Sequence, residues 1–306
     1  MPINFFLTIN SVLDQALSDI CRVQRISEAD ALKRAQQFLV DTSAQYYSDD
    51  PHIAYEDPLC RWAYLYTYVS AHANLIDNAL CAIEPLRNFL LSKIHSSQNL
   101  SICSLGGGPG SELLGFVKFI ERVKNPNDCI NLHFSLIDRV PQWDDSWHAL
   151  VNGLENTFIN NYGRSRQNWP ILINHSFLPL DMLDVNCFGG FLSRFGSTEL
   201  FVLNHVVSEL LAHPNEFQIV FNTIVNLAPD NAYFLIIDRN QGDVVTLCNK
   251  LVNENGEIVK IAEYTENRSM DADEQKQNLG KWYQQMNHNP KLRWKAYYCL
   301  AQKIIF

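Results

Sequence analysis

Three features are missing from this 306-residue sequence, and each absence counts against a class of protein. No uninterrupted apolar run reaches the roughly 18 residues that a membrane-spanning helix requires. The first residues, MPINFFLTINSVLDQ, lack the basic start and long apolar stretch of a secretory signal. The eight cysteines include no CxxC pair, which disfavours disulfides and a zinc site. We therefore expect an intracellular protein, cytoplasmic or nuclear, with free thiols, no membrane contact and no bound metal.

Positive charge is also scarce. The 24 Lys and Arg residues stand against 33 Asp and Glu residues, which gives a formal net charge of −9. The field of the whole chain therefore repels polyanions, and contact with a nucleic acid would need a local basic patch. Disorder is excluded, because 47% of the residues are hydrophobic and only 19% are charged. The sequence also has no internal repeat, low-complexity tract or linker rich in Pro and Ser.

The pattern of the chain changes once, near residue 97. Apolar residues follow a 3.6-residue period before that point and predict four helices: two before residue 43, one over residues 57–80 and one over residues 84–95. From residue 100 onward, short apolar runs alternate with helical patterns, which is typical of βαβ units and a parallel sheet. We expect a helical extension over residues 1–97, serving as a lid or facing the substrate, and an α/β domain over residues 98–306.

Seven apolar runs are expected to be strands. The runs cover residues 100–105, 131–138, 170–177, 199–205, 231–238, 256–266 and 291–306. Helices of the length needed for crossover connections separate most of the first five. The predicted fold is therefore α/β, a doubly wound and mostly parallel seven-stranded sheet whose last strand is reversed.

The strongest local signal is the segment LSICSLGGGPGSELL, residues 100–114, in which a strand leads directly into glycines and then a helix. Its glycines are Gly106, Gly107, Gly108 and Gly110. Glycine lets the chain turn tightly and lets a ligand approach the backbone, while the free N–H groups of a helix start attract a polar or anionic group. The spacing is G-x-G-x-G and not the dinucleotide pattern G-x-G-x-x-G, because residue 111 is Ser. We infer a cradle for a cofactor; the alternative is a turn without a ligand.

A carboxylate, Asp138, ends the second predicted strand. In nucleotide-binding βαβ units an acidic residue at this place accepts the ribose hydroxyls. The alternative role for Asp138 is that of a turn or helix-capping residue.

Together these features resemble the class I S-adenosylmethionine-dependent methyltransferases, which have a Rossmann-like fold. The matching segments are SICSLGGGPG, the strand end LID at residue 138, FLPLDML after the third strand and ELFVLNHVVSEL at the fourth. The resemblance covers residues 100–306, including the two extra strands at the end. It implies an enzyme that transfers a methyl group from S-adenosylmethionine.

The resemblance also implies which residues bind the cofactor. Gly106, Gly108 and Gly110, with Gly107 between them, would lie under its methionine part and ribose, and Asp138 would bind the ribose hydroxyls. Ser104 would lie beside the amino group, at a position that is commonly acidic in the family. Two further groups could contact the cofactor's amino group instead. They are Glu112 and the tyrosine-rich helix, where Arg61, Tyr64 and Tyr68 share one face, although such a stripe is more often core.

Five further residues are implied near the adenine and the acceptor. Asp181 and Met182 would contact the adenine, although Asp181 also suits a helix N-cap. Asn204 would face the reactive methyl group, and Asn204, His205 and Glu209 are the candidate catalytic residues. Methyl transfer needs mainly in-line positioning, plus a base when the acceptor carries a proton.

The end of the chain suggests RNA as the acceptor. Basic residues alternate there with aromatic rings, in a surface made of Lys276, Lys281, Trp282, Tyr283, Lys291, Arg293, Trp294, Lys295, Tyr297, Tyr298 and Lys303, while Arg164, Arg166 and Trp169 add to it from another loop. Cations beside stacking rings suit RNA, but the same alternation is typical of a strand with one solvent-facing side. The segment HVVSELLAHPNEF also resembles eukaryotic ribosomal-RNA uracil-N3 methyltransferases. A small-molecule or protein acceptor, or an inactive scaffold, remains as an alternative, and the oligomeric state is left open.

Overall fold

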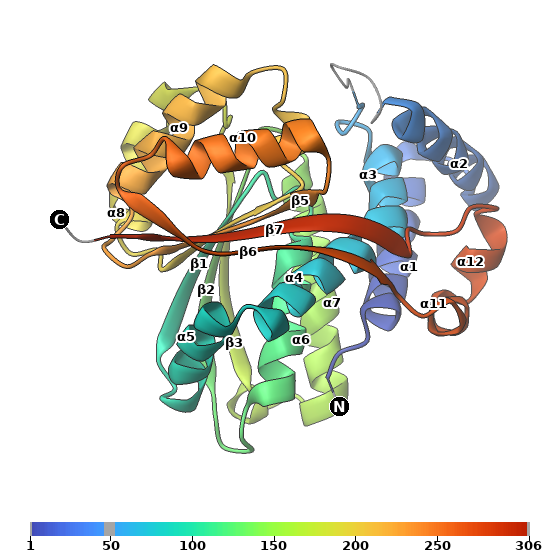
Figure 1. Ribbon diagram of the computed structural model, residues 1–306. Helices are drawn as coiled ribbons and strands as arrows, with labels where there is room; N and C mark the ends of the chain where they lie inside the picture. The colour runs from blue at the N-terminus through green and yellow to red at the C-terminus, as the bar shows by residue number, and fades with distance from the viewer. Residues whose placement is uncertain (1, 46–52, 305–306) are drawn as a thin grey trace.

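A computed structural model describes residues 2–45 and 53–304, and its centre is one sheet with the strand order β3-β2-β1-β4-β5-β7-β6 (Figure 1). The strands are β1 (Asn99–Leu105), β2 (Ile130–Asp138), β3 (Ile171–Pro179), β4 (Leu200–Asn204), β5 (Tyr233–Arg239), β6 (Ile258–Ser269) and β7 (Arg293–Lys303). The pairs among β1 to β5 are parallel, whereas β7 runs antiparallel to both β5 and β6. This confirms the doubly wound, mostly parallel sheet with a reversed last strand.

Helices cover both faces of the sheet, as a parallel sheet requires. Figure 1 shows α9 (Pro214–Leu227) and α10 (Gly242–Asn253) over one face, and α6 (Ser111–Val123) with α7 (Trp143–Tyr162) over the other. The buried apolar residues accordingly form two clusters. Every residue of β4 is buried, which explains its continuous apolar sequence.

The helical front consists of α1 (Phe5–Gln24), α2 (Glu28–Gln45), α3 (Pro58–Tyr64), the π-helical turn η1 (Leu65–Val69), α4 (Ser70–Ala82) and α5 (Glu84–His95). Helix α2 starts where a cap was expected, since the Ser27 hydroxyl oxygen accepts the N–H of Asp30 at 3.1 Å. The predicted third helix is continuous from α3 to α4, but its middle turn is π-helical, a local variation that the apolar period does not reveal.

The front shares a core with the α/β body. A Cβ on Gly115 of α6 would lie 2.6 Å from both the carbonyl oxygen of Ala73 and the Cβ of Ile76 in α4, so only glycine allows these helices to approach so closely. The indole N–H of Trp62 in α3 also donates to the carbonyl of Leu13 in α1, at 3.0 Å. The first contact fixes α4 against the body, and the second ties α3 to α1 within the front.

The remaining connections are short. They are η2 (Arg166–Asn168), η3 (Val185–Phe191), α8 (Leu192–Phe195), η4 (Val207–Glu209), α11 (Ala272–Leu279) and α12 (Lys281–Gln285). Helices α11 and α12 are separated by Gly280, whose φ is +53°. Figure 1 shows this pair beside the front helices α1 and α2. Among the described helices, none combines the length and the apolar character needed to cross a bilayer.

Candidate functional site

The glycine loop between β1 and α6 has a backbone that favours glycine. Gly106, Gly108 and Gly110 have φ values of +66°, +51° and +83°. A Cβ on Gly106 would lie 2.2 Å from Val206 Cγ2, and one on Gly110 would lie 2.3 Å from the ring of Trp147. A Cβ on Gly108 would meet nothing nearer than 3.7 Å. Packing therefore requires glycine at residues 106 and 110, whereas a Cβ at residue 108 would only make ordinary contact with the ring of Trp143.

Asp138 ties this loop to the end of β2. One of its carboxylate oxygens accepts the N–H of Gly108, the other accepts the N–H of Val140, and both distances are 2.9 Å. Burial raises the pKa of Asp138 to about 6, although these two hydrogen bonds act in the opposite direction. Each carboxylate oxygen keeps a further lone pair with which it can accept a ligand hydroxyl.

Six of the predicted residues line one cavity of about 410 Å³, which we call the glycine-loop cavity. They are Gly106, Gly108, Asp138, Asp181, Met182 and Glu209. Tyr55, Tyr64 and Trp143 complete its walls. Asp181 also accepts the N–H of Leu183 at 2.9 Å, so it stabilises a turn and not the helix N-cap that was its alternative role, while still lining the cavity.

Other predicted residues lie behind the loop and line none of the cavities described here. Asn204 is buried, and its side-chain amide donates to Glu112 at 2.9 Å. Burial raises the pKa of Glu112 to about 7, although the amide of Asn204 and the hydroxyls of Ser111 and Ser104 lower it. Gly107 donates its N–H to the carbonyl of Ile137 at 3.1 Å. Ligand contacts of Ser104, Gly107, Gly110 and Asn204 therefore remain predictions.

A second cavity of about 570 Å³, the histidine cavity, shares Tyr64 and Glu209 with the first. Residues of η1 and α4, the ends of β4 and β5, and the segment 288–295 line it together. Its charged and titratable residues are His72, His205, Glu209, Arg239, His288, Lys291, Arg293 and Lys295. No short motif could have pointed to this cavity, since its walls come from four distant parts of the chain.

His205 is the most constrained residue of the histidine cavity. Its φ is +63°, unusual for a residue with a Cβ, and its N–H donates to the carbonyl of Ile237 at 2.8 Å. The Nδ1 atom lies 3.5 Å from a carboxylate oxygen of the fully buried Asp238. The ring also stacks on that of His72, with centroids 4.4 Å apart. Asp238, which the sequence did not single out, therefore orients His205.

These contacts keep His205 neutral near pH 7. Burial lowers the pKa of His205, and the neighbouring carboxylate of Asp238 only partly opposes this. Burial alone would raise the pKa of Asp238, but its interaction with His205 and the N–H groups of Ser208 and Arg239 lower it overall. With Nδ1–H directed to Asp238, Nε2 carries the lone pair, and this atom is buried and has no hydrogen-bond partner among the described residues. Such an imidazole can act as a general base.

Glu209 stands where the two cavities meet. Enclosure by the cleft walls raises the pKa of its carboxyl to about 8, and the carboxylates of Asp138 and Asp238 reinforce the shift. The side chain nevertheless remains accessible within the cleft. Because Glu209 is exposed at the mouth of the cleft, solvent screens this shift, and its carboxyl group lies within reach of both cavities.

The expected basic and aromatic surface is wrong for five of its six aromatic rings. Trp169, Trp282, Trp294, Tyr297 and Tyr298 are at most 6% exposed, the last three because β7 lies inside the sheet and both of its faces are covered, whereas Tyr283 is half-buried. Rings in the core cannot stack on bases.

Part of the basic half is also engaged elsewhere. The ammonium group of Lys303 donates to three backbone carbonyls, Lys281 pairs with Asp14, and Arg166 pairs with Glu155. Arg293 and Lys295 remain exposed, and both line the histidine cavity.

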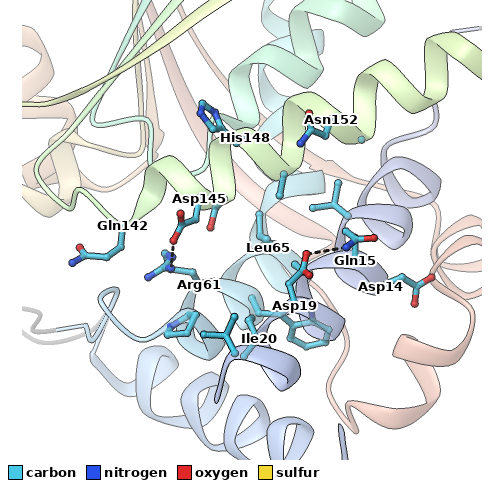
Figure 2. Close-up of a pocket in the computed structure, with 18 of the residues that line it drawn as sticks. Asp14, Gln15, Asp19, Ile20, Arg61, Leu65, Gln142, Asp145, His148 and Asn152 are labelled. Carbon is cyan, nitrogen blue, oxygen red and sulfur yellow. Dashed lines mark hydrogen bonds and ion pairs between the residues drawn. The ribbon is translucent and has the colours of Figure 1, made fainter. Parts of the chain in front are cut away.

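A third cavity, of about 940 Å³, lies between α1, α3 and α7 (Figure 2). Figure 2 shows Arg61 directed toward Asp145, with 3.3 Å between the guanidinium and the carboxylate. The guanidinium also donates to the carbonyls of Tyr55 and Glu56, at 2.8 and 3.0 Å. The structure thus places Arg61 outside the glycine-loop cavity, where it supports the segment 55–56 that forms one wall of that cavity.

No group of three His, Cys, Asp or Glu side chains suited to a metal ion occurs in the described part of the chain.

Comparisons with known proteins leave the activity to be argued from this site. No protein-family model matches the chain, and no curated protein does. Among solved structures, it is similar to an O-methyltransferase family protein from Burkholderia thailandensis, with 14% identity, a TM-score of 0.47, and coverage of 91% of this chain and 73% of the other. A SAM-dependent methyltransferase from Methanosarcina mazei is 9% identical, with a TM-score of 0.41 and coverage of 71% and 98%. The N-methyltransferase NodS from Bradyrhizobium japonicum, in complex with S-adenosyl-L-homocysteine, is 11% identical, with a TM-score of 0.35 and coverage of 87% and 98%.

Proposed function

We propose that this protein is an S-adenosylmethionine-dependent methyltransferase, with the cofactor in the glycine-loop cavity and the acceptor in the histidine cavity. One observation carries the proposal: the two cavities meet at Tyr64 and Glu209, one bounded by the glycine loop and Asp138, the other by His205. A methyl group that passes between two bound molecules needs two such adjoining sites.

The residues present suit the cofactor. Gly108 lines the cavity and has no side chain to keep a ligand from its backbone, and Asp138 has free lone pairs for the ribose hydroxyls. Met182 and Asp181 offer an apolar and a polar contact for the adenine in the same cavity. A volume of about 410 Å³ lies within the usual range for small-molecule sites.

The chain's own residues would position the acceptor and remove its proton. When bound, the cofactor supplies an activated methyl group as a sulfonium. The Nε2 atom of His205 would accept the acceptor's proton as the new bond to the methyl carbon forms and the bond from that carbon to sulfur breaks, which leaves S-adenosylhomocysteine. Asp238 would hold the imidazole in the required tautomer. Glu209 and Asn204 remain the other predicted catalytic residues.

The acceptor class is the finer part of this proposal. RNA, with a base nitrogen as in the uracil-N3 group, is supported by the exposed Arg293 and Lys295 at the histidine cavity. The burial of the aromatic rings removes the stacking contacts that the same prediction needs. The extension of residues 1–97 would act as a wall over the acceptor, through Tyr64, Tyr68 and His72. A location in the cytoplasm or nucleus belongs to the same proposal.

Calorimetric titration with S-adenosylhomocysteine tests the cofactor site. We expect the protein to bind it, and Asp138→Ala to weaken binding at least tenfold through loss of the ribose contact. Asp230→Ala is the matched control, because Asp230 is exposed near the opposite end of the sheet and should leave the affinity unchanged. If the wild type does not bind, or if Asp138→Ala binds equally well, the site is that of an inactive scaffold and the proposal fails.

A further inference from the structure

The histidine cavity has a charge opposite to that of the chain as a whole. Its lining contains Arg239, Lys291, Arg293 and Lys295, and Glu209 is its only carboxylate. The chain itself carries a formal charge of −9. In the described part of the chain, none of these four cations has a carboxylate partner within ion-pair distance.

Two of the cations lie deep in the cavity. Arg239 ends β5 and is half-buried, and its Nε atom has no hydrogen-bond partner among the described residues. Lys291 is half-buried, with its ammonium group 5.8 Å from the centre of the Tyr68 ring. Unpaired charge is costly to enclose, so these groups are arranged for an anion that arrives from outside.

The backbone holds these cations in place. The N–H of Lys291 donates to the carbonyl of Thr67 in η1 at 2.9 Å, and the N–H of Asn240 donates to the carbonyl of Lys295 at 3.0 Å. The hydroxyl of Tyr66 donates to the carbonyl of His288 at 2.6 Å. The segment 288–295 is therefore bonded to the helical front on one side and to the end of β5 on the other, so the cations need little rearrangement to bind.

Burial lowers the pKa of Lys291 and the carboxylate of Asp238 favours its charged form, but Asp238 forms no ion pair with these cations in the described part of the chain. It is fully buried behind His205, and its oxygens accept the N–H groups of Ser208 and Arg239. Glu209 lies at the boundary with the glycine-loop cavity. An oxyanion held between Arg239 and Lys291 would share the cavity with His205, the proposed base.

We propose that Arg239 and Lys291 form an anion-binding subsite, and that the methyl acceptor is a small molecule carrying a carboxylate or a phosphate. The role as acceptor rests on the proposed methyltransferase function, whereas the anion subsite itself does not. A small molecule is favoured over RNA because the two cations line a cavity of about 570 Å³ and five of the six rings predicted to stack on bases are buried, while Tyr64 and Tyr68 in the cavity wall are half-buried.

Titrations of the full chain with model anions test this subsite. The probes are phenyl phosphate, benzoate and the neutral isostere benzamide, each titrated with and without S-adenosylhomocysteine at constant ionic strength. We expect at least one anion to bind at least tenfold more tightly than benzamide, and the better of the two identifies the group recognised. Arg239→Gln and Lys291→Gln should each weaken that binding at least tenfold. Arg22→Gln and Lys33→Gln are matched controls, since both residues are exposed on the front helices α1 and α2.

The outcomes separate this subsite from the proposed function. Equal binding of anions and benzamide, or unchanged binding in both cavity variants, would overturn the subsite. A short oligouridylate that binds through Arg293 and Lys295 but is insensitive to Lys291→Gln, with no binding of the small anions, would assign RNA instead. Anion binding without any binding of S-adenosylhomocysteine would leave the subsite standing and remove the methyltransferase role.

Discussion

The variants Gly108→Ala and Gly110→Ala test whether each glycine of the loop is needed for ligand binding or for packing. Both glycines have positive φ, so a Cβ costs about 1–2 kcal/mol of backbone strain at either position. At Gly110 the new Cβ would also lie 2.3 Å from the Trp147 ring, and such overpacking adds about 1–3 kcal/mol. At Gly108 nothing lies nearer than 3.7 Å. We expect Gly110→Ala to lower the free energy of unfolding by about 2–5 kcal/mol and Gly108→Ala by only about 1–2 kcal/mol.

Gly108→Ala, the less destabilising of the two variants, should have the larger effect on ligand affinity. Gly108 and Trp143 both line the glycine-loop cavity, and a Cβ at residue 108 would lie 3.7 Å from the Trp143 ring, so Gly108→Ala should narrow the cavity and weaken S-adenosylhomocysteine binding at least tenfold while the protein stays folded. Chemical denaturation measures the stability of both variants, and calorimetry at a temperature where both are folded measures the affinity. If Gly108→Ala binds like the wild type, the loop is not a cofactor cradle. If Gly110→Ala is as stable as the wild type, the packing described around Trp147 is wrong.

Three further predictions concern other residues of the site. His205→Gln should reduce the rate of methyl transfer by about 10²–10⁴-fold, the usual contribution of a general base, and leave S-adenosylhomocysteine affinity within twofold. Tritium transfer from labelled cofactor measures the rate. A rate close to that of the wild type would exclude His205 as the base. Glu112 has its pKa raised to about 7 by burial, so the folded protein retains a proton that the unfolded chain releases, and wild-type stability should fall as the pH rises from about 5 to 8 by a few kcal/mol more than that of Glu112→Gln. Parallel pH dependences in denaturation experiments would refute this. Arg61→Met should weaken cofactor binding, because it removes the hydrogen bonds that hold segment 55–56. Arg87→Met is the control, since Arg87 also donates to a backbone carbonyl, and it should leave binding unchanged. Equal cofactor affinities of the two variants would contradict the supporting role of Arg61.

The sheet was predictable from sequence because its signals are local. Strands such as β4 are buried on both sides and appear as short apolar runs, and Gly106 follows β1 because the chain must turn there with positive φ. Asp138 was predictable for the same reason, since the end of a parallel strand places its side chain at the edge where ligands bind.

The histidine cavity was not predictable, because tertiary packing brings its walls together. His72 and His205 stack only when α4 lies across the ends of β4 and β5, and nothing near either residue in the sequence marks this. The π-helical turn η1 was equally hidden within a regular apolar period. The alternation of basic and aromatic residues in β7 was misleading, because such a pattern does not show whether one face of the strand or both are covered. Tyr297 and Tyr298 point to opposite sides of the sheet, yet both are buried.

The net charge bears on the choice of acceptor in a way that only the structure makes clear. The chain has a charge of −9, yet four of its cations line one cavity, where they repel one another. Such an unfavourable local arrangement is expected at functional sites. The repulsion between the acidic remainder and a ligand grows with the ligand's charge, whereas the attraction of the cavity is limited to the groups that enter it. A strand of RNA brings many phosphates near the acidic surface, and only a few of them can reach Arg239 and Lys291. A small acceptor with one or two negative charges meets the attraction and escapes most of the repulsion.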